Sequence, residues 1–531
     1  MLARPLARCV KCQLRSTTKH RPSLPSRCLS RQQKTYSTST SAQGDTTGQS
    51  SASILGIIND ELDRFAPSFK VHANQIAVLR SPDEFYETLK AKIRNAKSRI
   101  YLSTLYVGKT EHELLSTIRD ALQENQELKV SILTDALRGT RESPDRSCAS
   151  LLAPLISEFG PERVEIAMFH TPNLTGFRKR ILPKRINEGW GLQHMKLYGV
   201  DDELIMSGAN LSNDYFTNRQ DRYHLFSSKD ITDYFKRIHD AACSISFQVV
   251  PTEEGVNNYA LVWPENRYSP SPLENPIKYC EHASQLLNPL IQPKTAPISP
   301  QTSTDTTIYP LLQFSPLFKP NDTSTELPAL RSILRSLTTS TFAGSRWTFT
   351  AGYFNMTPEV RDLLISTRPA SATLIAASPW ANGFYGSKGV SGMLPAAYTL
   401  LSRRFLDAIS AAGLSSQIVL KEWRRGTVGE EGGWTYHAKG LWVTLPGEKY
   451  PCLSLVGSSN YTKRSYSLDL EANCLIVTRN EDLMKRLGQE EQWLQEHAQE
   501  MKRDDYARTE RRVGLHVRIA MAIVTLVGGA L

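Results

Sequence analysis

The chain has 531 residues, which is enough for two to four domains with substantial cores. Its apolar content of 40% and charged content of 22% are typical of a globular protein. The formal net charge of +10 would favour an acidic partner such as nucleic acid only if that charge were spread over the folded body.

The excess positive charge lies at the N-terminus. Residues 1–44 hold nine Lys and Arg and no Asp or Glu, whereas from Asp45 onward 54 basic residues face 53 acidic ones. A body this close to neutrality argues against nucleic-acid binding, which usually needs a basic surplus. An Arg-rich and Ser/Thr-rich segment without acid or a continuous apolar run is typical of a mitochondrial transit peptide. We therefore predict that residues 1–44 form a disordered transit peptide; a disordered basic tail is the alternative.

Helix and strand signals alternate at the start of the first predicted lobe, residues 52–281. The sequence predicts helices over 83–98 and 111–125 and strands over 99–107 and 128–135. Such alternation is typical of an α/β layered fold. Residues 282–308 are rich in Pro, Ser and Thr, which predicts a linker to a second lobe over residues 309–500.

The second half of the chain repeats the first in the same order. Residues 98–107 (SRIYLSTLYV) match 345–354 (SRWTFTAGYF), residues 129–139 match 372–383, and residues 194–223 match 437–473. In the last pair of segments, the acids Asp221 and Glu471 follow Asn210 and Asn460 at the same interval. We infer an internal duplication that provides two equivalent half-sites.

The last predicted segment, residues 501–531, is a basic and apolar tail. Arg508, Arg511 and Arg512 precede an apolar run over residues 519–531, which is shorter than the ~20 residues that span a bilayer. The pattern slightly favours a shallow membrane anchor. A helix packed on the domain, or a frayed tail, is the alternative.

Each half contains a His-x-Lys pair, His194/Lys196 in the first and His437/Lys439 in the second. Side chains two residues apart on a strand point to the same face, so each pair directs an imidazole and an ammonium group at one place. Two such half-sites can divide a phosphoryl transfer, because one imidazole attacks phosphorus while the other protonates the leaving group. A half-buried histidine is the commoner interpretation of a single pair, but two matched copies indicate catalysis.

These residues resemble the signature of the phospholipase D superfamily, His-x-Lys-x4-Asp followed by a segment of small residues that ends in Asn. The first copy supplies His194, Lys196, Asp201, Gly208, Ala209 and Asn210. The second has a longer hairpin and Thr444 in place of the Asp, but it keeps His437, Lys439, Gly457, Ser458 and Asn460. The segments STLYVG, NGFYGSKGVSG and YHAKGLWV are similar to the mitochondrial phosphatidylglycerophosphate synthases, and the resemblance covers most of residues 52–500.

The resemblance implies an α/β fold of two pseudo-symmetric phospholipase D-type lobes, each a mixed β-sheet flanked by helices, with the active site between them. It implies an enzyme that transfers the phosphatidyl group of CDP-diacylglycerol to sn-glycerol 3-phosphate through a phosphohistidine and releases CMP, without metal or other cofactor. With the transit peptide, it implies a location on the matrix face of the mitochondrial inner membrane. A phosphodiesterase or nuclease of the same superfamily, a cardiolipin-forming phosphatidyltransferase and a non-catalytic lipid-binding scaffold are the alternatives, and the oligomeric state is not predicted.

The resemblance also implies roles for single residues. His194 is the expected nucleophile and His437 the expected acid and then base, although the two roles can be exchanged. Asp221 and Glu471 are expected to orient the imidazoles, each across to the other half. The groups expected to hold the phosphoryl oxygens are Lys196, Lys439, Asn210 and Asn460.

Asp201 belongs to the catalytic signature, but its place in the turn GVDDE predicts a side chain that caps that turn. Thr444 would then replace a structural residue in a remodelled hairpin, and the second half-site would still work.

Weaker signals suggest further contacts to substrate. Lys388 lies in the Gly-rich segment 382–392, whose backbone N–H groups can cradle a phosphate. The other candidates are Ser212, Thr462, Arg138 and Arg222, with Arg141 and Arg219 beside them. An ordinary loop and surface ion pairs are the alternatives.

Overall fold

The computed structural model of the protein describes residues 51–141, 146–181, 187–253, 258–265, 267–293 and 304–526. The transit peptide predicted over residues 1–44 lies outside these ranges, as does the middle of the predicted linker. The described residues belong to one compact unit that contains both predicted lobes.

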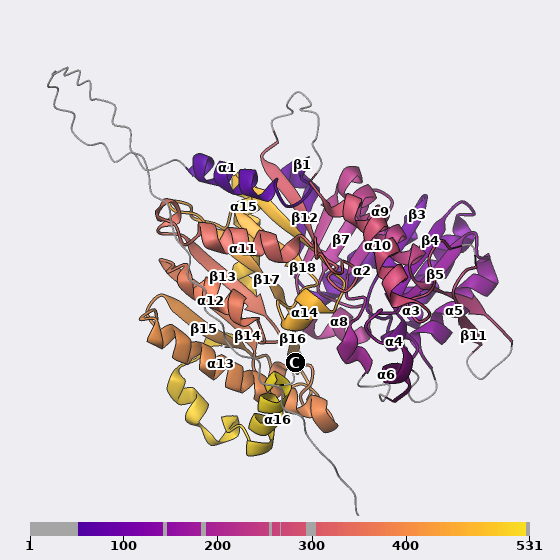
Figure 1. Ribbon diagram of the computed structural model, residues 1–531. Helices are drawn as coiled ribbons and strands as arrows, with labels where there is room; N and C mark the ends of the chain where they lie inside the picture. The colour runs from indigo at the N-terminus through magenta and orange to yellow at the C-terminus, as the bar shows by residue number, and fades with distance from the viewer. Residues whose placement is uncertain are drawn as a thin grey trace, which may run out of the picture. The chain divides into compact units, whose positions relative to one another are not determined.

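The first lobe is built on a nine-stranded mixed sheet, drawn in indigo to magenta in Figure 1. Strands β3, β4 and β5 run parallel, and the remaining neighbours are antiparallel. The strand order is β11 (Tyr259–Val262), β10 (Phe247–Pro251), β5 (Val164–Phe169), β4 (Lys129–Asp135), β3 (Arg99–Ser103), β6 (Leu197–Val200), β7 (Glu203–Ser207), β9 (Tyr223–Ser227) and β2 (Ile76–Leu79).

The sheet of the second lobe repeats the order and directions of eight of these strands, and each sheet has one additional edge strand without a counterpart in the other. Strands β13, β14 and β15 are the parallel set. The order is β1 (Phe69–Val71), β12 (Thr306–Gln313), β19 (Glu471–Thr478), β18 (Leu453–Gly457), β17 (Lys439–Thr444), β13 (Arg346–Ala351), β14 (Ser371–Ala377), β15 (Ile418–Trp423) and β20 (Ala498–Glu500). The predicted α/β fold of two pseudo-symmetric lobes is therefore confirmed, and the repeated segments of the sequence fall on equivalent strands.

Helix α2 (Pro82–Arg94) illustrates why the predicted helices form. The Ser81 side chain accepts a hydrogen bond from the N–H of Glu84 at the helix start. Phe85 and Leu89 are buried one turn apart and attach the helix to the sheet. The other long helices of the first lobe are α3 (His112–Glu124), α5 (Cys148–Phe159) and α9 (Lys229–Ser244). Those of the second are α11 (Glu326–Ser336), α12 (Pro358–Ser366), α13 (Leu394–Ala411) and α15 (Glu481–Trp493).

The two lobes share a hydrophobic core. Met195 and Leu197 of the first lobe belong to the same buried cluster as Trp442 and Val456 of the second. Strands β7 and β18 lie next to each other where the lobes meet. Because close-packed interiors resist relative sliding, the two half-sites are held in a fixed relation.

Two elements cross the predicted lobe boundary. Helix α1 (Ser51–Leu62) packs on α11, and β1 pairs with β12, with Phe69 opposite Ile308. The beginning of the chain segment assigned to the first lobe thus completes the core and the sheet edge of the second.

The predicted linker over residues 282–308 is too long. Helix α10 (Pro276–Ile291) continues through its first part, and β12 begins at Thr306. The buried positions Tyr279, Ala283 and Leu287 recur every four residues, and this helical period prevails over the Pro and Ser content of the segment. Residues 294–303 lie outside the described ranges.

The predicted tail packs partly on the second lobe. Helix α16 (Leu515–Leu526) buries Val517 and Met521 against Ala397 of α13. In the described residues no helix combines the length and the apolar character that crossing a bilayer requires.

Candidate active site

Backbone hydrogen bonds between the lobes set the position of each histidine. The short strands β8 (Arg219–Gln220) and β16 (Thr435–Tyr436) pair in parallel, and the N–H of His437 donates to the carbonyl of Gln220 at 2.8 Å. In the equivalent place, the N–H of His194 donates to the carbonyl of Leu470 at 2.9 Å. Gln220 and Leu470 directly precede Asp221 and Glu471, so each histidine is placed beside the acid of the other half.

The side chains complete this exchange. His194 Nδ1 lies 2.8 Å from Glu471 Oε2, and His437 Nδ1 lies 2.7 Å from Asp221 Oδ2. These are the cross-lobe contacts that the sequence predicts. At His194, the carboxylate at Nδ1 holds the proton on that nitrogen and leaves the lone pair on Nε2, the atom that would attack. Nδ1 of His437 lies 2.7 Å from the Asp221 carboxylate and 2.7 Å from Lys439 Nζ.

Both lysines of the His-x-Lys pairs are buried beside their histidines. Lys196 Nζ donates to the carbonyl of His194 at 2.6 Å, and Lys439 Nζ to that of His437 at 2.9 Å. Lys439 Nζ also lies 3.5 Å from Asp221 Oδ2.

Burial shifts the titration of the whole cluster. It lowers the pKa of His194 and His437 well below the ordinary range, and the neighbouring lysine charges act in the same direction. Burial also lowers the pKa of Lys196 to about 7 and raises that of Glu471 to about 7. The imidazoles are therefore neutral at physiological pH, which a nucleophile and a general base both require.

The small residues after the returning strands differ between the halves. In the ladders, Ser207 lies opposite Tyr223 and Gly457 opposite Asn473, so Gly208 is equivalent to Ser458. The match of Gly208 with Gly457 made from the sequence is thus wrong by one position. Counting backwards from the two asparagines gives the correct alignment.

This difference changes the surroundings of the two acids. A Cβ at Gly208 would lie 2.6 Å from Lys439 Nζ and 2.7 Å from Asp221 Oδ1, so glycine leaves the space that Lys439 uses. At the equivalent place, Ser458 Oγ donates a hydrogen bond to Glu471 Oε2. A lysine thus supports one acid, and a hydroxyl supports the other.

Two tyrosines that the sequence analysis missed enclose His437. The rings of Tyr215 and Tyr353 meet its imidazole edge-on, with centroids 5.2 and 5.1 Å away. The phenol oxygen of Tyr215 lies 3.4 Å from His437 Nε2. Ser465 occupies the position equivalent to Tyr215 in the second half, so His194 lacks the counterpart of this phenol.

Two buried acids, also missed, hold the segment before His194. Asp469 Oδ1 accepts from the N–H of Leu192 at 2.9 Å, and Asp135 Oδ2 accepts from the N–H of Gln193 at 3.0 Å. Only Asp469 carries a signal in the sequence that could have identified it, namely its position two residues before Glu471.

A cavity of about 420 Å³ joins the half-sites. Both lobes contribute to its wall, whose polar residues are Tyr106, Arg138, Glu188, His194, Asn210, Asp214, Tyr215, Arg219, Tyr353, Tyr398, His437, Asn460, Thr462, Arg464 and Asp469. In the described part of the chain, the amide oxygen of Asn210 has no hydrogen-bond partner. The cavity therefore presents to one ligand neutral imidazoles, an open amide and three arginines that are each paired with a carboxylate of the wall.

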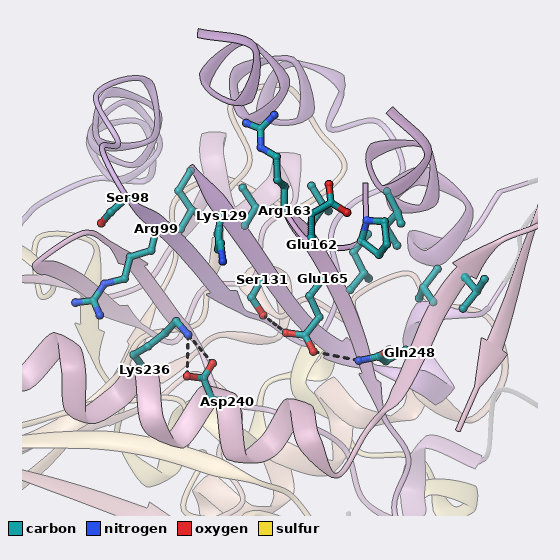
Figure 2. Close-up of a pocket in the computed structure, with 18 of the residues that line it drawn as sticks. Ser98, Arg99, Lys129, Ser131, Glu162, Arg163, Glu165, Lys236, Asp240 and Gln248 are labelled. Carbon is teal, nitrogen blue, oxygen red and sulfur yellow. Dashed lines mark hydrogen bonds and ion pairs between the residues drawn. The ribbon is translucent and has the colours of Figure 1, made fainter. Parts of the chain in front are cut away.

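A larger cavity of about 1060 Å³ lies on the first lobe and contains neither histidine of the half-sites (Figure 2). Several of its polar groups bind one another: Glu165 accepts from Ser131 at 2.9 Å and from Gln248 at 3.2 Å, and Lys236 pairs with Asp240 on α9. We therefore place the chemistry in the smaller cavity.

The structure does not bring Asp201 into the catalytic cavity. Its carboxylate accepts hydrogen bonds from the backbone N–H groups of Lys97 and Ser98, both at 2.8 Å, and from that of Arg99. Asp201 is therefore a structural and not a catalytic residue, but its side chain bonds the neighbouring segment 97–99 and not the turn GVDDE that the sequence predicts it to cap. Thr444 occupies the equivalent place at the end of β17, where a longer loop follows.

We expect Asp201→Ala to lower the free energy of unfolding by about 2–4 kcal/mol, because several backbone donors lose a charged acceptor. The residue also has φ 50°, a conformation that alanine tolerates poorly. Urea denaturation measures the loss, and Asp201→Asn, which tolerates this φ, should lose less. The kcat/KM of the folded fraction should stay within about twofold, whereas a large fall would return Asp201 to the catalytic site.

Arg222 is likewise not a substrate contact. Its guanidinium is buried, pairs with Glu490 at 2.7 Å and lies 3.7 Å from the ring centre of Trp442. Burial would raise the pKa of Glu490, but Arg222 and His224 outweigh it and hold the value at about 2. The predicted role of Arg222 is therefore corrected to that of a structural ion pair.

The remaining weak candidates divide into two groups. Arg138, Arg219 and Thr462 line the cavity. Lys388 is exposed in the loop that follows Gly383, and Ser212 Oγ donates to Asp214 Oδ1 at 2.6 Å. Among the described residues no group of three or more His, Cys, Asp and Glu side chains is arranged to hold a metal ion.

Comparison with known proteins agrees with this geometry. Residues 89–241 match the family model described as cardiolipin synthase, PLD-like domain. The crystal structure of phosphatidylserine synthase from Haemophilus influenzae superposes with a TM-score of 0.68 at 22% identity, covering 89% of this chain and 97% of that one. This likeness shows the fold.

Two similar curated proteins extend over nearly the whole chain. The CDP-diacylglycerol–glycerol-3-phosphate 3-phosphatidyltransferase of Saccharomyces pastorianus is 44% identical, covering 86% of this chain and 88% of that protein. The mitochondrial protein of the same name from Homo sapiens is 36% identical, covering 86% and 84%. With duplicated lobes, crossed His–acid pairs and relatives of this length and identity, the chain belongs to the family of CDP-diacylglycerol–glycerol-3-phosphate 3-phosphatidyltransferases.

Proposed function

We propose that this protein transfers the phosphatidyl group of CDP-diacylglycerol to sn-glycerol 3-phosphate, giving phosphatidylglycerophosphate and CMP. The observation that carries the proposal is the pair of crossed His–acid contacts in one cavity, in a chain whose relatives bear the name of that reaction. Purified protein in detergent micelles, given CDP-diacylglycerol and labelled glycerol 3-phosphate, should release CMP and place the label in lipid. Cleavage of single-stranded DNA without lipid product, or transfer only to phosphatidylglycerol, would overturn the proposal in favour of the alternatives from the same superfamily.

The first step forms a phosphohistidine. His194 Nε2 attacks the phosphatidyl phosphorus, the bond from phosphorus to the CMP oxygen breaks, and protonated His437 gives its proton to CMP. The charge of the bound diphosphate raises the pKa of His437 against the effect of burial. In the second step the glycerol hydroxyl gives its proton to neutral His437 and attacks phosphorus, and the bond to His194 breaks.

The surroundings of the imidazoles support this division of roles. Glu471, the partner of His194, is fixed by the Ser458 hydroxyl, as suits a nucleophile that must keep one orientation. His437 has the phenol of Tyr215 beside Nε2, where a proton is exchanged. Lys196, Lys439, Asn210 and Asn460 are proposed to hold the phosphoryl oxygens.

Arg138 and Arg219 are our candidates for the acceptor phosphate. Arg138 stacks on Tyr106 and Arg219 on Tyr215, which holds both guanidinium groups at the cavity wall. Thr462 can add a hydroxyl contact. Lys388, in the loop after Gly383, remains a candidate for the same phosphate or for the diphosphate.

Activity is expected to peak near neutral pH. Glu471, with its pKa raised by burial to about 7, must be ionised to accept from His194, so kcat/KM should fall as the pH drops below that value. Lys196, with its pKa lowered by burial to about 7, must be charged to bind phosphate, so kcat/KM should also fall as the pH rises. Initial rates across the neutral range, with thermal denaturation at each pH as a control for folding, measure this. A flat profile would contradict it.

The proposed location is the matrix face of the mitochondrial inner membrane. The vertebrate relatives are named mitochondrial, and the predicted transit peptide over residues 1–44 supports the same compartment. The lipid substrate requires that the cavity reach a bilayer surface.

A further inference from the structure

Helix α16 has a second, uncovered apolar face. Val517 and Met521 face α13, whereas Leu515, Ile519 and Ile523, four residues apart, are 72%, 51% and 55% exposed. A row of large aliphatic side chains open to solvent is uncommon in a protein that contacts only water.

Unpaired arginines lie next to this row. A cavity of about 330 Å³ between α13 and the start of α16 is lined by Arg403, Arg512 and Arg518. Within the described residues none of these three side chains forms a hydrogen bond or an ion pair, in contrast to Arg511, which binds Glu422 at 2.6 Å. Three guanidinium groups without a protein partner around one hollow favour a phosphate group as the ligand.

The same helix α13 connects this surface with the catalytic cavity. Its residues Leu394 and Tyr398 line the cavity, and Ala397 between them contacts α16. The loop before α13 also borders the cavity and exposes Val390. Figure 1 shows α16 in yellow against α13 at the lower edge of the view.

We propose that this face of the second lobe docks onto a bilayer that contains anionic phospholipid. Leu515, Ile519 and Ile523 enter the boundary between headgroups and acyl chains, and the arginine pocket holds a lipid phosphate. The inference rests on the proposed function, because a cavity of about 420 Å³ suits the polar part of CDP-diacylglycerol, whereas its acyl chains need an apolar phase at the rim.

Helix α6 (Gly176–Ile181) offers the same chemistry on the first lobe. Phe177 and Ile181 are exposed next to Arg178, Lys179 and Arg180. A contact from each lobe would set the cavity mouth towards the lipid.

Flotation with vesicles of phosphatidylcholine, with and without phosphatidylglycerol, tests the proposal on the full-length protein. The native protein should prefer the anionic vesicles. The triple variant Arg403→Gln/Arg512→Gln/Arg518→Gln should bind them roughly a hundredfold more weakly at low salt and lose the preference. Leu515→Ser/Ile519→Ser/Ile523→Ser should weaken binding to both kinds of vesicle. The control variant, Lys129→Gln/Arg237→Gln in the larger cavity of the first lobe, should bind as the native protein does.

Activity assays separate this inference from the proposed function. In detergent micelles both triple variants should keep the native kcat, whereas on vesicles their KM for CDP-diacylglycerol should rise. If the arginine variant binds the vesicles as tightly as the native protein, the proposed docking surface is wrong, even if transfer proceeds. The proposal is also wrong if either triple variant changes the oligomeric mass of the protein and leaves flotation unchanged. Absence of transfer by a native protein that floats as expected would overturn the proposed function instead. If the serine variant unfolds, the flotation of the arginine variant still tests the proposal, because its three side chains are exposed.

Discussion

His194→Ala should abolish phosphatidyl transfer, with kcat lower by on the order of 10⁴-fold or more. The imidazole that would carry the phosphatidyl group is then missing, and water cannot replace it because the side chain is buried against Glu471. CMP release from CDP-diacylglycerol measures the loss. The thermal stability of the variant shows whether the fold survives the small cavity.

Trapping the intermediate gives the sharper test. Native protein incubated with CDP-diacylglycerol labelled at the phosphatidyl phosphorus, without glycerol 3-phosphate, should acquire a label that is labile in acid and stable in base. His194→Ala should acquire none, whereas His437→Ala should acquire it slowly. The reverse pattern would exchange the two roles, and a label that resists acid would exclude a phosphohistidine.

The crossed arrangement of the half-sites is what the resemblance to the phospholipase D superfamily implies, and local spacing and strand order are consistent with it. His-x-Lys defines one face of a strand, and the equal interval from each Asn to Asp221 or Glu471 places the acids on equivalent strands. Two such halves around a pseudo-twofold axis bring each acid to the other histidine. The contacts of His194 and His437 agree with this.

Other residues owe their place to parts of the chain that local spacing cannot bring together. Arg222 follows Asp221 directly, yet its partner Glu490 comes from α15, 268 residues further on. Its sequence neighbours indicate a phosphate ligand, whereas tertiary packing makes it a buried ion pair. In the same way, α10 forms despite the Pro-rich composition of the predicted linker, because Tyr279, Ala283 and Leu287 are buried in the core and stabilise the helix.

Glu471→Gln should lower kcat by roughly 10³–10⁴-fold without unfolding the protein. An amide can accept from His194 Nδ1–H but carries no charge to stabilise the imidazole as it attacks, and its NH₂ can select the wrong tautomer. Single-turnover formation of the labelled protein measures this step directly. Ser458→Ala, which removes one hydrogen bond to Glu471 and keeps its charge, should cost far less, about tenfold.

The stability of the Glu471→Gln variant distinguishes orientation from folding. Because burial raises the pKa of Glu471 to about 7, the folded protein binds this proton more tightly than the unfolded chain, so native stability falls as the pH rises towards that value. Glutamine does not titrate, so the variant should lose this part of the decline and at slightly alkaline pH equal or exceed the native protein in urea denaturation. Lost activity with retained stability would establish Glu471 as a residue that positions and polarises His194. A parallel loss of stability and activity would instead make it a structural acid.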